Sequence, residues 1–147
     1  MLLAHQDRKL IRAIHRYQRY RDKPGPIAWL GCAWGKLGHM FWSVISASDI
    51  HRDAMIDASV RFPHLTGVVI HQDAIIAEGC LIMQQVTLGQ TSGTKAPRLD
   101  RNVYIGAGAK VLGNIHVAAN ARIGANAVVL SDVPEDTTAV GIPARIL

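Results

Sequence analysis

One histidine and one aspartate in this chain have the types and the spacing of a general-base pair. His64 stands in residues 62–67, which read Phe-Pro-His-Leu-Thr-Gly, and Asp49 lies fifteen residues before it. An imidazole that a carboxylate holds at one ring nitrogen can accept a proton at the other, for example from a hydroxyl group. The pair could therefore activate a hydroxyl nucleophile, provided that the fold brings the two residues together.

A repeat of aliphatic residues predicts the fold that could do so. From residue 99 onward an aliphatic residue recurs at every sixth position, and a small or apolar residue follows each of them by four. The members of the first series are Leu99, Ile105, Val111, Val117, Ile123 and Val129. Helices repeat near 3.6 residues and strands at 2, whereas a parallel β-helix lays one short strand on a flat face in each six-residue unit. Because three units close a triangular coil of about eighteen residues, Asp49 and His64 could lie near one corner on adjacent coils.

The repeat is interrupted twice, and both interruptions are candidate sites. The unit from Phe62 to Val69 carries two extra residues and contains His64. The step from Leu88 to Leu99 is eleven residues instead of six, and its excess, residues 89–96, is polar and rich in glycine. We expect the second interruption to be a loop ejected from a corner. Departures from a regular repeat are where functional demands override local rules.

Charge and cysteine content exclude several classes of function. The net charge of +5 lies in residues 1–25, so the rest of the chain is neutral, which argues against nucleic acid as the main ligand. Cys32 and Cys80 are too few for a disulfide framework, and we expect two reduced thiols in a cytoplasmic protein. The N-terminus lacks the apolar run and cleavage site of a signal peptide. No set of His, Cys, Asp or Glu has ligand spacing, so we expect no metal.

The N-terminal third predicts two helices before the repeat begins. Residues 5–22 have apolar residues at helical spacing with arginines mostly off that stripe, and Pro24, Gly25 and Pro26 end the helix. Residues 27–47 are apolar and rich in tryptophan. This segment could pack on the first coil or on a neighbouring subunit, span a membrane, or lie at the inner membrane face with the basic helix beside it. We therefore expect a helical arm over residues 1–48 and a β-helix domain with a C-terminal tail that folds back over residues 49–147.

Several stretches resemble a known family. Residues 104–109 and 122–127 match the hexapeptide repeat of the left-handed β-helix acyltransferases, and residues 106–115, 128–134 and 141–146 resemble the serine acetyltransferase branch of that superfamily. The resemblance extends roughly from residue 49 to the C-terminus. It implies a mainly β fold, a left-handed parallel β-helix with a short α-helical N-terminal region. It also implies an acetyl-CoA-dependent O-acetyltransferase, which acts as a homotrimer with active sites between neighbouring solenoids.

The resemblance also assigns roles to individual residues. In the serine enzymes the catalytic histidine stands in Asp-His-x-Thr-Gly, fifteen residues after the aspartate of Asp-Ile-His. His64 and Asp49 match these positions, as the general base and the carboxylate that orients it. Direct transfer to a hydroxyl group would follow, with backbone N–H groups near Gly89 steadying the oxyanion. Small corner residues would let a pantetheine arm approach the backbone, and basic residues could meet the phosphates of coenzyme A. The predicted cofactor-binding residues are Gly89, Ala107, Lys110, Ala125 and Arg145.

Two departures from the family pattern concern the acceptor. Pro63 replaces the aspartate that precedes the catalytic histidine, and Lys95-Ala96 replaces an Arg-His pair at the end of a loop that is about three residues longer in the serine enzymes. Lys95 and Arg98 remain as predicted substrate-binding residues. Because a zwitterionic amino acid needs both a carboxylate and a cation, we predict a sugar hydroxyl in capsular or exopolysaccharide biosynthesis as the acceptor. Free L-serine is the alternative acceptor, and a non-catalytic β-helix scaffold is a second alternative.

Overall fold

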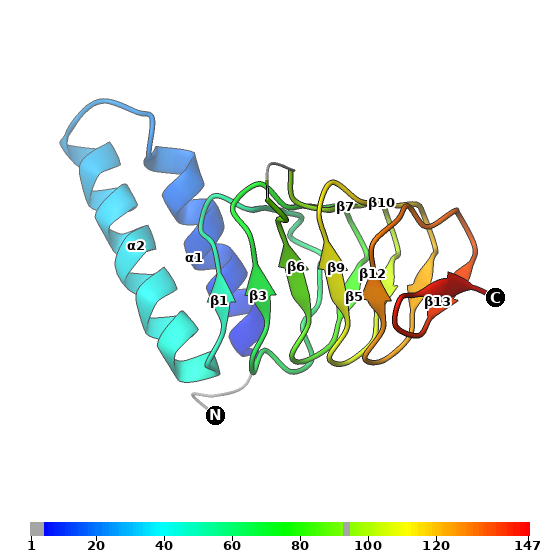
Figure 1. The fold of residues 1–147 in the computed structure, drawn as a ribbon. Helices are drawn as coiled ribbons and strands as arrows, with labels where there is room; N and C mark the ends of the chain where they lie inside the picture. The colour runs from blue at the N-terminus through cyan, green and yellow to red at the C-terminus, as the bar shows by residue number, and fades with distance from the viewer. Residues whose placement is uncertain (1–4, 93–94) are drawn as a thin grey trace.

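The aliphatic repeat forms the three flat faces of a parallel β-helix in the computed structural model, which describes residues 5–92 and 95–147 (Figure 1). Face A stacks five strands, and faces B and C stack the others. Face A contains β1 (Asp49–Ile50), β3 (Val69–Ile70), β6 (Thr87–Gly89), β9 (Lys110–Leu112) and β12 (Val128–Val129). Face B contains β2 (Met55–Ile56), β4 (Ile75–Ile76), β7 (Arg98–Leu99) and β10 (His116–Val117). Face C contains β5 (Leu81–Ile82), β8 (Tyr104–Ile105), β11 (Arg122–Ile123), β13 (Thr138–Val140) and β14 (Arg145–Ile146).

Each inward residue stacks on the equivalent residue of the next coil. On face A the parallel register aligns Ile50, Ile70, Leu88, Val111 and Val129 in that order. All five are buried, and the residue before each of them points outward. The mainly β fold and the six-residue repeat predicted from the sequence are therefore confirmed.

The two interruptions lengthen individual coils without disturbing the stack. Inward residues on face A advance by eighteen residues from Ile70 to Leu88 and again from Val111 to Val129. The coil that contains His64 advances by twenty residues from Ile50 to Ile70. The coil that contains the polar loop advances by twenty-three residues from Leu88 to Val111. The extra residues are therefore expelled at corners, where they can carry side chains that the aliphatic stack does not constrain.

The first helix, α1 (Gln6–Tyr20), packs its apolar face on the first coil. Leu10, Ile11 and Ile14 are buried and belong to the same core cluster as the inward residues of the solenoid. Asp7 anchors the beginning of α1, because its Oδ2 accepts hydrogen bonds from Arg61 Nε at 2.8 Å and from the backbone N–H of Phe62 at 3.4 Å. This residue is only 4% exposed. The helical arm thus shares its core with the solenoid, and the division at residue 49 into an arm and a domain stays a prediction.

The second helix, α2 (Pro26–Ser46), lies beside α1 (Figure 1). Its N-terminal proline occupies the first turn, where a missing backbone N–H leaves no hydrogen bond unmade. Two glycines allow the helices to approach closely. A Cβ on Gly35 would lie 2.6 Å from the backbone nitrogen of Tyr17, and one on Gly31 would lie 2.6 Å from Cδ2 of Tyr20. The glycines of the tryptophan-rich segment therefore serve the contact between the two helices.

Much of the surface of α2 is apolar and exposed in the single chain. The exposed side chains are Ile27, Trp29, Leu30, Trp34, Leu37, Met40, Phe41, Val44 and Ile45. Among residues 5–92 and 95–147 no helix is both long enough and apolar enough to cross a membrane. The exposure of this face does not by itself identify a contact with a neighbouring subunit or a membrane surface, which stays a prediction.

The end of the chain folds back on the solenoid, as expected. Strand β14 pairs with β13 in the antiparallel direction, and the backbone N–H of Ala144 donates to the carbonyl oxygen of Val128 at 2.8 Å. Both cysteines are free thiols, and burial raises the pKa of Cys80 to about 11. At neutral pH Cys80 is therefore a protonated, packed side chain in the core.

Truncation of one inward residue tests the stacking of the coils. Ile123 is fully buried, so Ile123→Ala should lower the free energy of unfolding by about 2–5 kcal/mol. Its outward neighbour Arg122 is exposed and contacts the ring of Tyr104, so Arg122→Ala should cost less than about 1 kcal/mol. Urea unfolding followed by circular dichroism measures both variants. Equal losses for the two would contradict the assignment of inward and outward positions.

The anchor of α1 predicts a stability that depends on pH. Burial raises the pKa of the Asp7 carboxyl, but hydrogen bonds from Arg61 and from the backbone N–H groups of Arg8 and Phe62 outweigh it, so the pKa lies below its ordinary value of 3.8. The carboxylate therefore contributes stability above that value and loses the contribution as the pH falls through its folded pKa. Asp7→Asn should cost about 1–3 kcal/mol at neutral pH and progressively less in acid.

Unfolding of the wild type and of Asp7→Asn across this pH range measures the effect. Asp22→Asn is the matched control, because the Asp22 side chain is 83% exposed beside Arg21 and should change little at any pH. A difference between wild type and Asp7→Asn that stayed constant in acid would contradict the assignment.

Candidate functional site

One edge of the solenoid, where the chain passes from face C to face A, carries His64 and several other predicted site residues. We call it the His64 edge, and it comprises residues 63–67, 84–85, 107–110 and 125–126. Backbone hydrogen bonds stack these turns. Gln85 N–H donates to the Thr66 carbonyl at 3.0 Å, Gly108 N–H to the Gln84 carbonyl at 2.9 Å, and Asn126 N–H to the Ala107 carbonyl at 2.8 Å. The predicted base and the predicted cofactor-binding residues Ala107 and Ala125 therefore lie along one edge.

Small residues at this edge have a structural cause of their own. A Cβ on Gly106 would lie 2.6 Å from the backbone nitrogen of Ala125 and 2.8 Å from the carbonyl carbon of Gly124. Gly108 has φ +73°, and a Cβ there would lie 2.1 Å from Oδ1 of Asn126. Stacking of the coils therefore requires glycine at both positions. The same small corners leave the backbone accessible, which suits an extended pantetheine arm.

Lys110 also belongs to the His64 edge. Its Nζ donates to the carbonyl oxygen of Gln85 at 2.6 Å, so the ammonium group is held beside the turn that stacks on Thr66. Arg145 lies elsewhere, on the exposed C-terminal strand β14 of face C. Gly89 ends β6 on face A and lines a second pocket with Asp49, His51 and His71. The predicted cofactor-binding residues thus divide between the His64 edge, the opposite end of face A and the end of face C.

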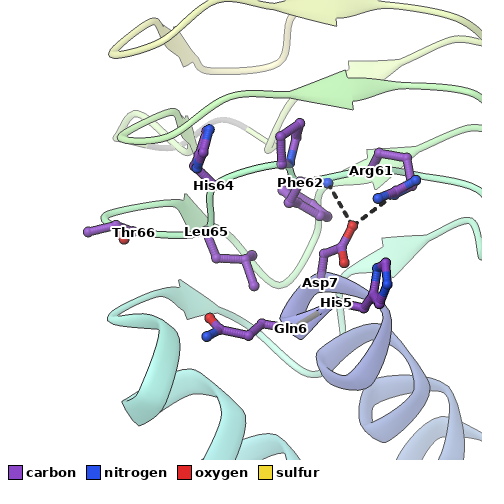
Figure 2. Close-up of a pocket in the computed structure, with 9 residues that line it drawn as sticks. His5, Gln6, Asp7, Arg61, Phe62, His64, Leu65 and Thr66 are labelled. Atoms are coloured by element: carbon purple, nitrogen blue, oxygen red, sulfur yellow. Dashed lines mark hydrogen bonds and ion pairs between the residues drawn. The ribbon is translucent and has the colours of Figure 1, made fainter. Parts of the chain in front are cut away.

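His64 lines a polar pocket of about 300 Å³ between its turn and the beginning of α1 (Figure 2). The lining residues are His5, Gln6, Asp7, Arg61, Phe62, Pro63, His64, Leu65 and Thr66. Arg61 and Asp7 are the charged members, and they form the ion pair that anchors α1. Sequence reasoning missed both residues. One signal was available for Asp7, because it stands three and seven residues before Leu10 and Ile14, on the buried face of the helix.

Asp49 and His64 lie on adjacent coils, but their side chains line different pockets. The backbone joins the two segments, with Gly67 N–H donating to the Ala47 carbonyl at 2.8 Å and Asp49 N–H to the Val68 carbonyl at 2.8 Å. The Asp49 side chain points outward from face A into the pocket that Gly89 lines. Within the described residues no hydrogen bond connects the Asp49 and His64 side chains, so the orienting role of Asp49 stays a prediction.

The two predicted substrate-binding cations lie away from His64 in the single chain. Lys95 lines a pocket with Arg21, Asp53 and Asp73 on the side of face B. Arg98 begins β7 on face B, and its Nε donates to the Asp100 carboxylate at 3.4 Å. The chain reaches face B only after leaving the far end of face A, so neither cation can serve an acceptor at His64 of the same chain. Gly93 and Thr94 of the polar loop lie outside the described residues.

Metal ligands do not gather at this edge. No group of three or more His, Cys, Asp or Glu side chains in residues 5–92 and 95–147 is arranged to hold a metal ion. The polar groups that line the His64 pocket are the imidazoles of His5 and His64, the carboxamide of Gln6, the guanidinium of Arg61 paired with the Asp7 carboxylate, and the hydroxyl group of Thr66.

Comparison with known proteins relates the chain to one group of enzymes. Residues 97–131 match the family model for the bacterial transferase hexapeptide (six repeats). A serine acetyltransferase of Synechococcus elongatus is 50% identical over 107 residues, which are 71% of this chain and 44% of the relative. A serine acetyltransferase of Escherichia coli K12 is 42% identical over 130 residues, 76% of this chain and 48% of the relative. The chain thus spans less than half the length of these curated relatives.

Solved structures show the same likeness along nearly the whole chain. A serine acetyltransferase in complex with CoA superimposes with a TM-score of 0.83 at 37% identity, over 99% of this chain and 59% of that one. Soybean serine acetyltransferase complexed with serine gives a TM-score of 0.83 at 35% identity, again over 99% and 59% of the two chains. The likeness includes the two helices as well as the solenoid, because residues 5–48 fall within that coverage.

These relatives contradict the predicted sugar acceptor and its place in polysaccharide biosynthesis. That prediction depended on the loss of a carboxylate at Pro63 and of a histidine at Ala96. The similarity to serine enzymes, at 42–50% identity, favours the alternative acceptor, L-serine. Two substitutions at the rim of a site were too little evidence, since other residues can supply a charge to the same ligand. The chain thus carries the hexapeptide repeat of the bacterial transferases, fits the left-handed β-helix fold, and is similar along most of its length to the serine acetyltransferases.

Proposed function

We propose that this protein transfers an acetyl group from acetyl-CoA to the hydroxyl group of L-serine. The observation that carries the proposal is the His64 edge, which aligns an imidazole in a polar pocket with the small-residue corners of the second and third coils that follow it. Relatives named serine acetyltransferases, one of them solved in complex with CoA and another with serine, support the choice of donor and acceptor.

His64 acts as the general base in this proposal. It takes the proton from the serine hydroxyl group, so that the oxygen can attack the carbonyl carbon of the acetyl thioester. A carbon–oxygen bond forms as the carbon–sulfur bond breaks, and the imidazolium returns the proton to the departing sulfur. Asp49 orients the imidazole, and backbone N–H groups near Gly89 stabilise the negative charge that develops on the carbonyl oxygen.

The donor lies along the His64 edge. Ala107 and Ala125 leave room beside the backbone for the pantetheine arm, and Lys110 places a positive charge at the same edge. Arg145 supplies a second cation for the phosphates from the end of face C. The residues present therefore fit a long donor with an amide-containing arm and an anionic end.

The active form is a homotrimer with its sites between neighbouring solenoids. Support comes from the placement of Lys95 and Arg98 on face B, remote from His64 of their own chain. A neighbouring copy can present these cations to the His64 pocket, as the resemblance to the family implies. In this arrangement each site combines the His64 edge of one copy with the polar loop of the next.

An acceptor assay tests the proposed reaction. The purified protein, given acetyl-CoA, should release free thiol when L-serine is added, and mass spectrometry should detect O-acetylserine. L-alanine is the matched control, because it lacks only the hydroxyl group and should release no thiol. Absence of serine-dependent thiol release would contradict the proposal and favour a scaffold.

Replacement of the base tests the role of His64. His64→Ala should lower kcat with L-serine by about 10²–10⁴-fold, because a positioned base contributes that much, while CoA binding measured by calorimetry stays unchanged. Asp49→Asn should lose less, because the base remains. His116→Ala is the matched control, since His116 is an exposed histidine of face B that pairs with Asp100. Near-native turnover by His64→Ala would remove this residue from the mechanism.

A further inference from the structure

We propose that the two N-terminal helices dock the protein on a bilayer surface that carries anionic phospholipids. The docking surface combines the exposed apolar face of α2 with a row of cations on α1. None of its residues takes part in the proposed acetyl transfer, so the inference stands or falls independently of that function.

The apolar part of the docking surface is a continuous ridge along α2. Its side chains follow one another at intervals of one to four residues, and all are exposed: Ile27, Leu30, Trp34, Leu37, Phe41, Val44 and Ile45. Because α2 has 21 residues, the ridge extends for about 30 Å. A large exposed apolar patch that polar groups border marks an interaction site on a protein surface.

The cationic part is a row of arginines along α1. These arginines recur at intervals of three or four residues, and all are exposed: Arg8, Arg12, Arg16 and Arg19. Arg12 and Arg16 make no hydrogen bond or ion pair with any residue in the described parts of the chain. The two helices contain a single acidic residue, Asp7, which is buried in its ion pair with Arg61. No negative charge of the helices therefore offsets the arginines at the surface.

A groove between the two helices brings the cationic and the apolar parts together. It has a volume of about 490 Å³, and its lining residues are Lys9, Arg12, Ala13, Arg16, Trp34, Leu37, Gly38, Phe41 and Trp42. One wall is therefore cationic, and the other is apolar and largely aromatic. A phospholipid can place its phosphate group at Arg12 and Arg16 while its acyl chain lies along Trp34 and Phe41.

Charge distinguishes an anionic bilayer from a second copy of this chain as the occupant. A second copy would bring its own row of arginines to the same surface, and like charges repel. A bilayer supplies phosphate groups for the arginines and, just below them, hydrocarbon for the ridge. Tryptophan and arginine suit this boundary, because each has an apolar body and a polar tip.

The docking surface lies at one end of the molecule (Figure 1). The helices α1 and α2 occupy the end at which the solenoid begins, and β13 lies near the other end. A bilayer at the helical end leaves the coils that carry Ala107 and Ala125 in solution. Docking is thus compatible with a donor bound along the His64 edge.

Tryptophan fluorescence measures docking at α2 itself, because all three tryptophans of the chain, Trp29, Trp34 and Trp42, lie in this helix. Vesicles of equal parts phosphatidylcholine and phosphatidylglycerol should bind the protein and shift its emission to shorter wavelength, as indole rings leave water. Added salt should weaken this binding, because it screens the arginines. Vesicles of phosphatidylcholine alone should bind at least about tenfold more weakly.

Two double variants test the two parts of the docking surface. Arg12→Gln with Arg16→Gln should weaken binding to the anionic vesicles by about 10–30-fold, since each cation near such a surface contributes a factor of about five. Leu30→Ser with Leu37→Ser should also weaken binding and should reduce the emission shift, because it polarises the ridge.

Matched controls remove the same chemistry from the solenoid. Arg101→Gln with Arg122→Gln takes two exposed arginines away, and Leu130→Ser takes an exposed leucine away. Both should bind anionic vesicles within about twofold of the wild type, because surface charges more than a Debye length away are screened. Circular dichroism checks the fold of every variant. The lipid and salt dependence of the wild type tests the proposal even if a variant does not fold.

Salt-sensitive binding to anionic vesicles that both helix variants lose, and both controls keep, supports the proposal. Equal binding to neutral and anionic vesicles, or binding to neither, overturns it. An emission shift that soluble polyglutamate produces equally well would assign the surface to an acidic protein. A shift that grows with protein concentration in the absence of vesicles would assign it to a second copy. Either of these results also overturns the proposal.

Discussion

The stacking of inward aliphatic side chains is the constraint on which the rest of the structure depends. Residues such as Ile70, Leu88 and Val111 lie directly above one another in parallel register. Because parallel strands are spaced by about 4.8 Å, this register sets the distance between successive coils. Corners that are eighteen residues apart in regular coils must then also lie above one another. The alignment of His64 with Ala107 and Ala125 is thus a consequence of packing in the core.

This constraint explains why structural and functional signals coincide at the His64 edge. Gly106 and Gly108 are required by the close approach of successive backbones, whatever the protein binds. The corners that result are also narrow and accessible, which suits an extended ligand. A small-residue corner therefore indicates the fold more directly than it indicates a cofactor. The side chains expelled from the repeat, His64 above all, carry the evidence for chemistry.

The sequence alone predicts those features of the fold and the site that depend on interactions between residues close together in the chain. The six-residue period predicts the solenoid, because each unit contacts its neighbours in a fixed register. Helical spacing predicts α1, and the apolar run after Pro26 predicts α2. Arg61 lines the same pocket as His64 and pairs with Asp7, which is fifty-four residues away and is brought there by the docking of a helix. A local pattern places Asp7 on the buried face of α1, but no local pattern reveals that its partner is Arg61. Lys95 and Arg98 are predicted to bind the acceptor because they lie in the polar loop or just after it. The structure places them on face B, so a position in that loop does not by itself show which face of the solenoid a side chain reaches.

The acceptor was predicted wrongly for a related reason. Pro63 lines the His64 pocket, whereas Ala96 is buried outside it, so the two substitutions alone do not describe the charges around an acceptor. A substitution shows which charge one position has lost. Whether another residue supplies that charge depends on the fold. The ion pair of Arg61 with Asp7 shows that α1 contributes a buried carboxylate to the pocket that His64 lines.

Hydrogen exchange with and without CoA tests the central claim most directly. The claim is that the edge of the solenoid that contains the His64 turn also binds the donor. Peptides that cover residues 104–112 and 122–130 should exchange more slowly when CoA is bound, because the ligand lies along their corners. A peptide that covers residues 52–60, which passes along face B, should be unaffected. Protection confined to the face B peptide, with no change at residues 104–112 and 122–130, would contradict the account.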